Sequence, residues 1–153
     1  LLEARGFSAE DFALSHPGGS LGRRLLLQVS DVMHSGDRLP IVSTNTPLRE
    51  AIITISQKGL GMTAVIHSDN TLAGIFTDGD LRRVFDQASL DLQNTPIHKV
   101  MTISPVVAEA NMLAAEALNL METRKINGLI VVNDANEPVG ALNMHDLLKA
   151  GVV

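Results

Sequence analysis

The sequence contains no cysteine, tryptophan or tyrosine, and only four phenylalanines. Without cysteine, disulfide frameworks, thiolate catalysis and cysteine-based zinc sites are excluded, and a cytoplasmic location is expected. The scarcity of aromatic rings argues against a stacking platform for single-stranded nucleic acid. A formal net charge of −5 argues against a basic stripe for a phosphate backbone. The composition therefore predicts no nucleic-acid partner.

Long hydrophobic runs are also missing. A run such as residues 130–132 is far shorter than the roughly 20 residues that cross a bilayer, so no membrane association is expected. Hydrophobic residues still make up 45% of the 153-residue chain, enough to bury a core in one ordinary domain or two very small ones. Leu1 is not a natural start, and no signal peptide opens the sequence. We expect the chain to begin inside a longer protein.

The second half of the chain repeats the first. The sequence Gly-Ile-Phe-Thr-Asp-Gly-Asp-Leu at 74–81 aligns with Gly-Ala-Leu-Asn-Met-His-Asp-Leu at 140–147, a separation of 66 residues. The same separation carries the apolar positions 48, 51, 52 and 55 onto 114, 117, 118 and 121. Upstream, Val32-Met33 matches Val100-Met101 at a separation of 68, so the copies differ in length by two residues. Two copies this small are expected to pack against each other, because neither can bury its own sheet face.

Each copy predicts the same α/β unit, in the order strand, helix, strand, strand, helix. The apolar spacing i, i+3, i+4, i+7 from residue 48 indicates a buried helical stripe, and Gly59 and Gly61 suit its end. Residues 63–67 and 72–76 predict two strands joined by a turn, and 78–85 a second helix. We place the first repeat at 29–88 and the second at 95–153, with a polar connector between them.

The segment at 74–80 has the chemistry of a ligand site. A strand ends there, and Thr77 and Asp80 flank the start of a helix, where backbone N–H groups and the dipole favour an anion. Thr77 offers a hydroxyl to a phosphate or ribose, and Asp80 a carboxylate to vicinal hydroxyls. Alternatively, Thr77 is only a helix cap and Asp80 a first-turn acid.

The repeat and this segment together resemble the CBS domain, over residues 29–153. The ligand motif of that family is glycine, an apolar pair, threonine or serine, two variable residues and aspartate, which Gly74, Thr77 and Asp80 satisfy. In the second copy Gly140 and Asp146 remain, but Asn143 replaces the hydroxyl residue. The resemblance implies tandem CBS repeats packed as a pseudo-two-fold pair, with a nucleotide-type effector in the cleft between them. It also implies weaker binding in the second half.

Further contacts follow if such a ligand binds. With no tryptophan or tyrosine, its base is expected between aliphatic walls, and backbone groups near Met62 and Thr63 are expected to read its polar edge. The walls are expected at Ile41, Val65, Ile103 and Val131. Arg82 and Arg83 follow Asp80 on the same helix and are within reach of a phosphate; solvated helix charge is the alternative. The histidines at 34, 67, 98 and 145 show no metal-ligand spacing, so neither a metal nor a cofactor is expected.

The opening segment at 5–26, which contains Ser-His-Pro-Gly-Gly at 15–19, resembles the end of the sugar isomerase domain of arabinose-5-phosphate isomerases. We assign 1–28 to that domain's tail and linker. That family interconverts D-ribulose 5-phosphate and D-arabinose 5-phosphate, which feeds 3-deoxy-manno-octulosonate synthesis for lipopolysaccharide or capsule in Gram-negative bacteria. His16 matches its active-site histidine; the alternative is a loop residue at a helix break. The family's other catalytic residues lie upstream of Leu1, so this chain alone is not expected to isomerise sugars.

The resemblance implies a regulatory role, with an adenine nucleotide or the CMP-activated octulosonate sugar as effector. It also implies a homo-oligomer, a dimer of CBS pairs within a parent that can be a tetramer. We expect that dimer to bury helical faces with Leu81, Val84, Leu147 and Leu148. Two alternatives remain open: a structural oligomerisation module without ligand, and a CBS pair attached to another sugar-phosphate-binding protein, such as a regulator.

Overall fold

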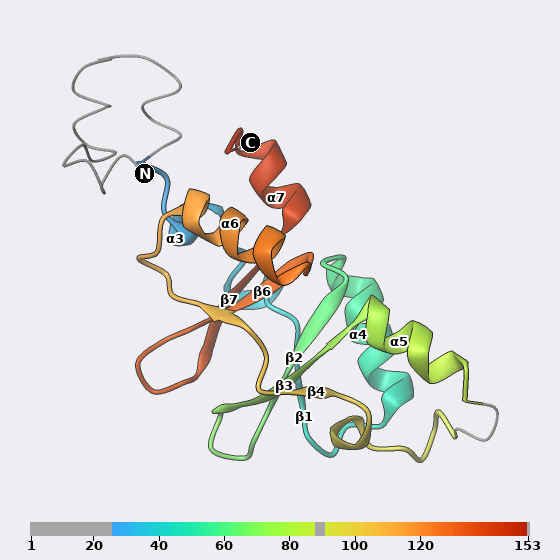
Figure 1. Ribbon diagram of the computed structural model, residues 1–153. Coiled ribbons are helices and arrows are strands. Elements are labelled where there is room, and N and C mark those ends of the chain that lie inside the picture. The colour runs from blue at the N-terminus through green and yellow to red at the C-terminus, as the bar shows by residue number, and fades with distance from the viewer. Residues whose placement is uncertain (1–25, 88–90, 153) are drawn as a thin grey trace, which may run out of the picture.

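A computed structural model describes residues 26–87 and 91–152 of the chain (Figure 1). His16 and most of the predicted isomerase tail lie outside the described residues. Within the described part, no helix is long and apolar enough to cross a membrane.

The first repeat follows the predicted order. Its elements are β1 (Ile41–Ser43), α4 (Leu48–Lys58), β2 (Met62–Ile66), β3 (Leu72–Thr77) and α5 (Asp78–Phe85). The short helix α3 (Val29–Val32) and a 3-10 helix at Gly36–Arg38 precede β1. Helix α4 ends at Gly59, whose φ of 72° is the left-handed conformation that glycine adopts without steric cost.

The second repeat has the same elements. They are β5 (Val107–Ala108), α6 (Ala114–Arg124), β6 (Gly128–Val132), β7 (Pro138–Asn143) and α7 (Met144–Lys149). A 3-10 helix at Ile97–Lys99 and the two-residue strand β4 (Thr102–Ile103) precede them. The helices of both repeats lie toward one side of the molecule, and the β2–β3 and β6–β7 turns project at the opposite side (Figure 1).

The two repeats exchange edge segments. Strand β4 belongs to the second repeat by sequence, yet it completes the first sheet, whose order is β1-β2-β3-β4, by pairing Thr102 with Ile75. In the other direction, His34 of the first repeat forms an antiparallel bridge with Ala141 in β7 of the second sheet. Since Ala141 is the counterpart of Ile75, and His34 that of Thr102, the two exchanges are equivalent. This confirms two copies packed as a related pair.

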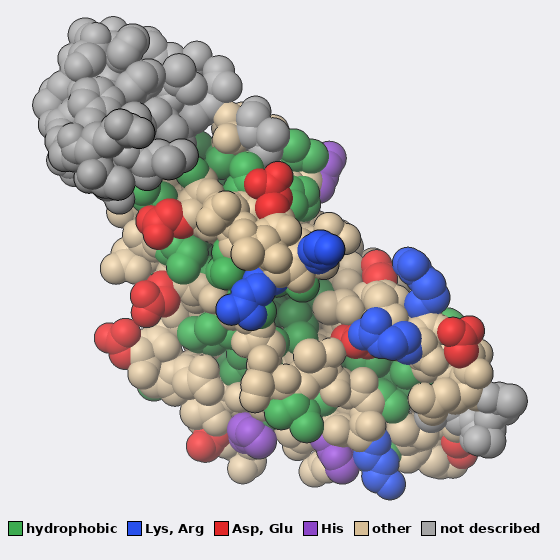
Figure 2. Space-filling model, viewed as in Figure 1, with side chains coloured by type: hydrophobic (Ala, Val, Ile, Leu, Met, Phe, Trp, Pro, Cys, Tyr) green, Lys and Arg blue, Asp and Glu red, His purple; other side chains and the backbone are tan. Residues whose placement is uncertain are grey.

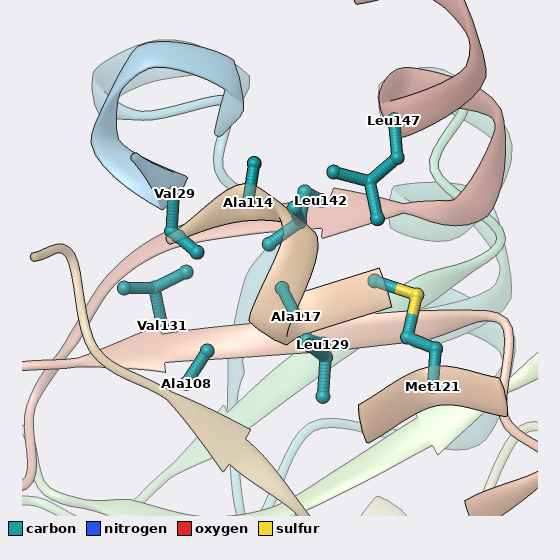
Figure 3. Packing of buried hydrophobic residues seen from close by; sticks show 9 residues of the cluster. All are labelled: Val29, Ala108, Ala114, Ala117, Met121, Leu129, Val131, Leu142 and Leu147. Carbon is teal, nitrogen blue, oxygen red and sulfur yellow. The ribbon is translucent and has the colours of Figure 1, made fainter. Parts of the chain in front are cut away.

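Buried side chains on one face of each sheet pack under that repeat's own helices. The first repeat buries Leu48, Ala51 and Ile55 of α4 against its sheet. The second repeat forms the matching cluster shown in Figure 3, which consists of Val29, Ala108, Ala114, Ala117, Met121, Leu129, Val131, Leu142 and Leu147. Val29 enters this second-repeat cluster from α3, so the exchanged N-terminal segment also contributes to its core.

A further buried cluster joins the two sheets. Its members come from both repeats: Leu39, Leu60, Met62, Ala64, Leu72, Ile75, Ile130, Val132 and Ala141. Alternation along β2 places Ala64 in this shared cluster and its neighbour Val65 in the first repeat's own cluster. Each sheet is therefore covered on both faces, which explains why its central strands are buried along most of their length.

Candidate functional site

A cavity of about 740 Å³ lies where the repeats meet. Both repeats contribute the loop before their second strand (59–62 and 125–128) and the start of their last helix (77–80 and 143–145). Thr102 and the segment 104–106 line it from the second repeat, and Arg83 from the first. Figure 2 shows Lys and Arg side chains bordering a hollow that has hydrophobic side chains in it. The volume falls within the range of small-molecule sites.

Thr77 and Asp80 form a reciprocal cap at the start of α5. The Asp80 backbone N–H donates to Thr77 Oγ1 over 3.2 Å, and the Thr77 backbone N–H donates to Asp80 Oδ2 over 2.9 Å. This satisfies two N–H groups that a helix start leaves unpaired. The capping alternative raised by the sequence is therefore realised, whether or not a ligand also uses these groups.

The Asp80 carboxylate has partners beyond the cap. Thr102 donates its hydroxyl to Asp80 Oδ1 over 3.0 Å from the other repeat, and the Arg83 guanidinium pairs with the same oxygen. Asp80 is only 4% exposed, whereas the Arg83 side chain is 71% exposed. A carboxylate accepts about four hydrogen bonds. The Thr77 hydroxyl, which donates to Asp80 Oδ2 over 3.1 Å, is the fourth protein donor, so any ligand hydroxyl on Asp80 must replace one of these four groups.

The second repeat keeps the cap with different chemistry. The Asp146 backbone N–H donates to Asn143 Oδ1, and the Asn143 backbone N–H donates to Asp146 Oδ2, both over 2.9 Å. The other oxygen, Asp146 Oδ1, lies 2.9 Å from His34 Nε2. An imidazole here takes the place that the Thr102 hydroxyl takes beside Asp80.

The structure brings five of the predicted ligand residues to the cavity: Met62, Thr77, Asp80, Arg83 and Asn143. Thr63 is fully buried and donates its hydroxyl to the Ala64 carbonyl oxygen, while Arg82 is exposed outside the lining. Asp146 does not line the cavity.

The four predicted aliphatic walls do not line this cavity, and that expectation is corrected. Val65 and Val131 are fully buried in the clusters under the helices, because alternation along β2 and β6 points them away from the junction. Ile41 lines a separate cavity of about 290 Å³, and Ile103 is 70% exposed. The apolar lining instead includes Leu60, Ile75, Val106 and Ile126.

Sequence reasoning missed several lining residues, of which Lys125 and Thr102 are the most informative. Lys125 directly follows α6 at the position of Gly59 in the first repeat, and it has a φ of 57° where Gly59 has 72°. A lysine at the helix end where the other copy has glycine is a sequence difference that could have pointed to a role for Lys125. Thr102 carries no comparable sequence signal, because it reaches Asp80 only through the pairing of β4 with β3 of the other repeat.

Curated relatives match this chain over its whole length. The chain is 58% identical over 153 residues to arabinose 5-phosphate isomerase KdsD of Pseudomonas aeruginosa and 52% identical to that of Escherichia coli K12. It covers 47% and 46% of those two proteins, so it spans about half the length of the relatives it matches.

Solved structures show the same fold at lower identity. CBSX2, solved in complex with AMP, superposes with a TM-score of 0.68 at 22% identity, over 82% of this chain and 96% of that one. The CBS domain pair of MJ0100, solved with 5′-methylthioadenosine and S-adenosyl-L-methionine, gives 0.72 at 19% identity, over 81% and 94%.

Comparison with protein families matches the CBS domain twice, at residues 29–87 and 97–153. Each match contains one set of elements in the order strand, helix, strand, strand, helix. The chain therefore belongs to the CBS domain family and carries a tandem pair of these domains.

Proposed function

We propose that this chain is the regulatory part of a longer arabinose-5-phosphate isomerase and that it binds a nucleotide-type effector in the cavity between the repeats. The parent would interconvert D-ribulose 5-phosphate and D-arabinose 5-phosphate, which feeds 3-deoxy-manno-octulosonate synthesis. Candidate effectors are an adenine nucleotide and the CMP-activated octulosonate sugar. The similarity to the isomerases KdsD, of which the chain spans about half, supports the parent's activity.

One observation carries the regulatory role: the cavity is built from both repeats. Thr77 and Asp80 approach it from the first repeat, and Thr102 and Lys125 from the second. A ligand in contact with both sides favours the relative position of the repeats that fits it best. It can therefore shift a conformational equilibrium by its difference in affinity for the two states. The nucleosides and nucleotides named for CBSX2 and MJ0100 support this ligand class.

The partners of Asp80 suggest how a nucleotide binds. Arg83 is the donor most easily displaced, since its side chain is largely exposed while the Thr77 backbone N–H is fixed in the cap. Ribose hydroxyls would then donate to Asp80, and the released guanidinium would pair with the phosphate. This exchange keeps the buried Asp80 carboxylate hydrogen-bonded and pairs the guanidinium with the phosphate, which matters because an unsatisfied buried charge is costly.

A structural module without ligand is the second candidate, and the same residues favour it. Every acceptor position of Asp80 is used within the protein, so the fold does not require a ligand there. On this alternative, Asp80 joins the repeats through Thr102 and only holds the pair together.

A ligand screen distinguishes the two candidates. Thermal-shift assays and titration calorimetry with AMP, ATP, CMP and the CMP-activated octulosonate sugar would be run on the purified chain. Saturable binding of at least one compound is expected, and its effect on isomerase activity would then be measured on the full-length enzyme. If all four compounds leave melting temperature and heat unchanged, the structural module is favoured.

Lys125 offers a prediction with opposite effects on stability and binding. A non-glycine residue at its φ of 57° is strained, so Lys125→Gly is expected to raise the free energy of unfolding by about 0.5–1 kcal/mol. The same change removes a cavity cation and should weaken nucleotide binding about threefold to tenfold, equivalent to about 0.7–1.4 kcal/mol. Circular dichroism melts and calorimetry measure the two effects.

Lys125→Gln is the matched control, because it removes the charge but keeps the strained conformation. It should weaken binding similarly without added stability. Unchanged nucleotide affinity in both variants would show that Lys125 does not contact the ligand.

We also propose that the chain forms a homodimer, but through a surface that differs in part from the predicted one. Val84 and Leu147, predicted on the dimer face, are 3% and 0% exposed and belong to the cores of their own repeats, while Leu81 is partly buried against one. Leu148, which was also predicted on this face, is 52% exposed, and Phe85, at 63%, and Ile53 on α4 are further exposed apolar side chains on the helices. These are the residues that we propose a dimer covers.

Light scattering at micromolar concentration is expected to report at least a dimer. Phe85→Asp should shift the mass toward a monomer, because burying an unpaired carboxylate opposes association. A wild-type chain that remains monomeric over this range would contradict the assembly proposal.

A further inference from the structure

The two motif aspartates, Asp80 and Asp146, are contacted by different side chains from the other repeat. Asp80 meets a hydroxyl, that of Thr102, and both residues line the cavity. Asp146 meets the imidazole of His34, and neither residue is part of that lining. The positions are equivalent, since Thr102 pairs with Ile75 in β3 and His34 bridges Ala141 in β7. The repeat symmetry is therefore broken at the point where a ligand would engage the carboxylate.

The chain beyond His34 reinforces this difference. The two additional residues of the first repeat lie between His34 and β1, where Gly36–Arg38 forms a 3-10 helix. Lys58 donates its ammonium to the Asp37 carbonyl oxygen and ties this helix to the end of α4. On the other side, the shorter segment 104–106 lines the cavity. The segment that carries His34 is thus tied to α4 and lies off the cavity lining, while Asp80 and Thr102 line the cavity.

We propose that each chain binds one nucleotide, on the Asp80 side, and that His34 is the residue that withholds Asp146 from a second. This inference rests on the proposed nucleotide-binding function. It adds the number of nucleotides bound per chain and the residue that limits that number. Asp146 then has a structural role. It caps α7 together with Asn143, and its contact with His34 anchors the exchanged segment of the first repeat.

Titration calorimetry with AMP and with CMP tests the stoichiometry. One nucleotide per chain is expected for the wild type, and Asp146→Ala should leave that ratio at one. Saturable binding of two nucleotides per chain would overturn this inference but leave the proposed function standing. Absence of saturable binding with both probes and with the other two compounds of the screen would overturn both.

Nuclear magnetic resonance and a substitution test the role of His34. At saturating nucleotide, the backbone amide of Asp80 should shift while those of His34 and Asp146 stay in place; the reverse pattern would overturn the assignment. His34→Thr copies the Thr102 arrangement and should add a second, weaker binding event, with a ratio above one. A ratio that stays at one in both His34→Thr and His34→Ala, with wild-type melting temperatures, would show that His34 does not exclude a second nucleotide.

Discussion

Asp80→Ala is expected to lower nucleotide affinity about tenfold to hundredfold. The carboxylate is the proposed acceptor for the ribose hydroxyls, and losing a charge-assisted hydrogen bond costs about 1.5–3 kcal/mol. The substitution also leaves Arg83 without its ion-pair partner in the free protein, so part of the loss reflects a reorganised cavity. Titration calorimetry with the strongest compound from the screen measures the change.

Asp146→Ala is the matched control. It removes an equivalent reciprocal cap from α7, with the same hydrogen-bond lengths to a neighbouring backbone N–H, but it lies off the cavity lining. Both variants should lose about 1 kcal/mol of stability through the cap, and only Asp80→Ala should lose affinity strongly. Abolished binding in Asp146→Ala with intact binding in Asp80→Ala would place the ligand in the other half.

The largest effect on stability is expected for Gly74→Ala. A Cβ at Gly74 would lie 2.5 Å from the Thr102 carbonyl oxygen and 2.8 Å from Met101 Sδ. The sulfur can move, but the carbonyl belongs to β4 and can retreat only by weakening its pairing with β3. Overpacking of this kind costs about 1–3 kcal/mol. Since the chain has no tryptophan or tyrosine, urea unfolding followed by circular dichroism is the suitable measurement.

Gly79→Ala provides the comparison. Its Cβ would lie 3.6 Å from Thr77 Oγ1, an ordinary contact, and Gly79 is inside α5. This variant should gain about 0.4–1 kcal/mol, since alanine restricts the unfolded chain. Equal losses of stability in both variants would contradict the explanation that the motif glycine makes room for the exchanged segment.

The glycine of the family motif therefore has a structural explanation that does not involve a ligand: at Gly74 a side chain would collide with β4. Its counterpart Gly140 also lies under an exchanged segment, but there a Cβ would meet only the Met33 side chain, 2.3 Å from its Sδ, which can move. Each motif glycine sits under the segment that arrives from the other repeat. Substituting Gly74 is therefore expected to disturb the pairing of the repeats before it affects any ligand contact, and substituting Gly140 should cost less.

Local patterns were sufficient for much of this molecule. The 66-residue repeat can be read directly by comparing the two halves of the sequence. The i, i+3, i+4, i+7 stripe of α4 and the Thr77–Asp80 cap depend on residues within a few positions of one another. Short-range hydrogen bonding and helical periodicity determine such features, so the order of elements and the helix starts were predictable.

The faces of the central strands were not predictable in the same way. Strand β2 is buried from Met62 to Val65, so its apolar residues do not alternate with polar ones. Periodicity then cannot tell which side chains face the junction and which face the helices. This is why Val65 and Val131 were placed in the site from the sequence and Ile75 was missed.

By itself, the sequence determined the repeat, the order of strands and helices in each copy and the Thr77–Asp80 cap, because the last two depend on local bonding. Only the tertiary structure decided what each aspartate meets. Thr102 reaches Asp80 from 22 residues away, and His34 reaches Asp146 from 112 residues away. Both contacts exist because the repeats exchange edge segments to bury their sheet faces together, and no local pattern records which strand edge accepts which segment.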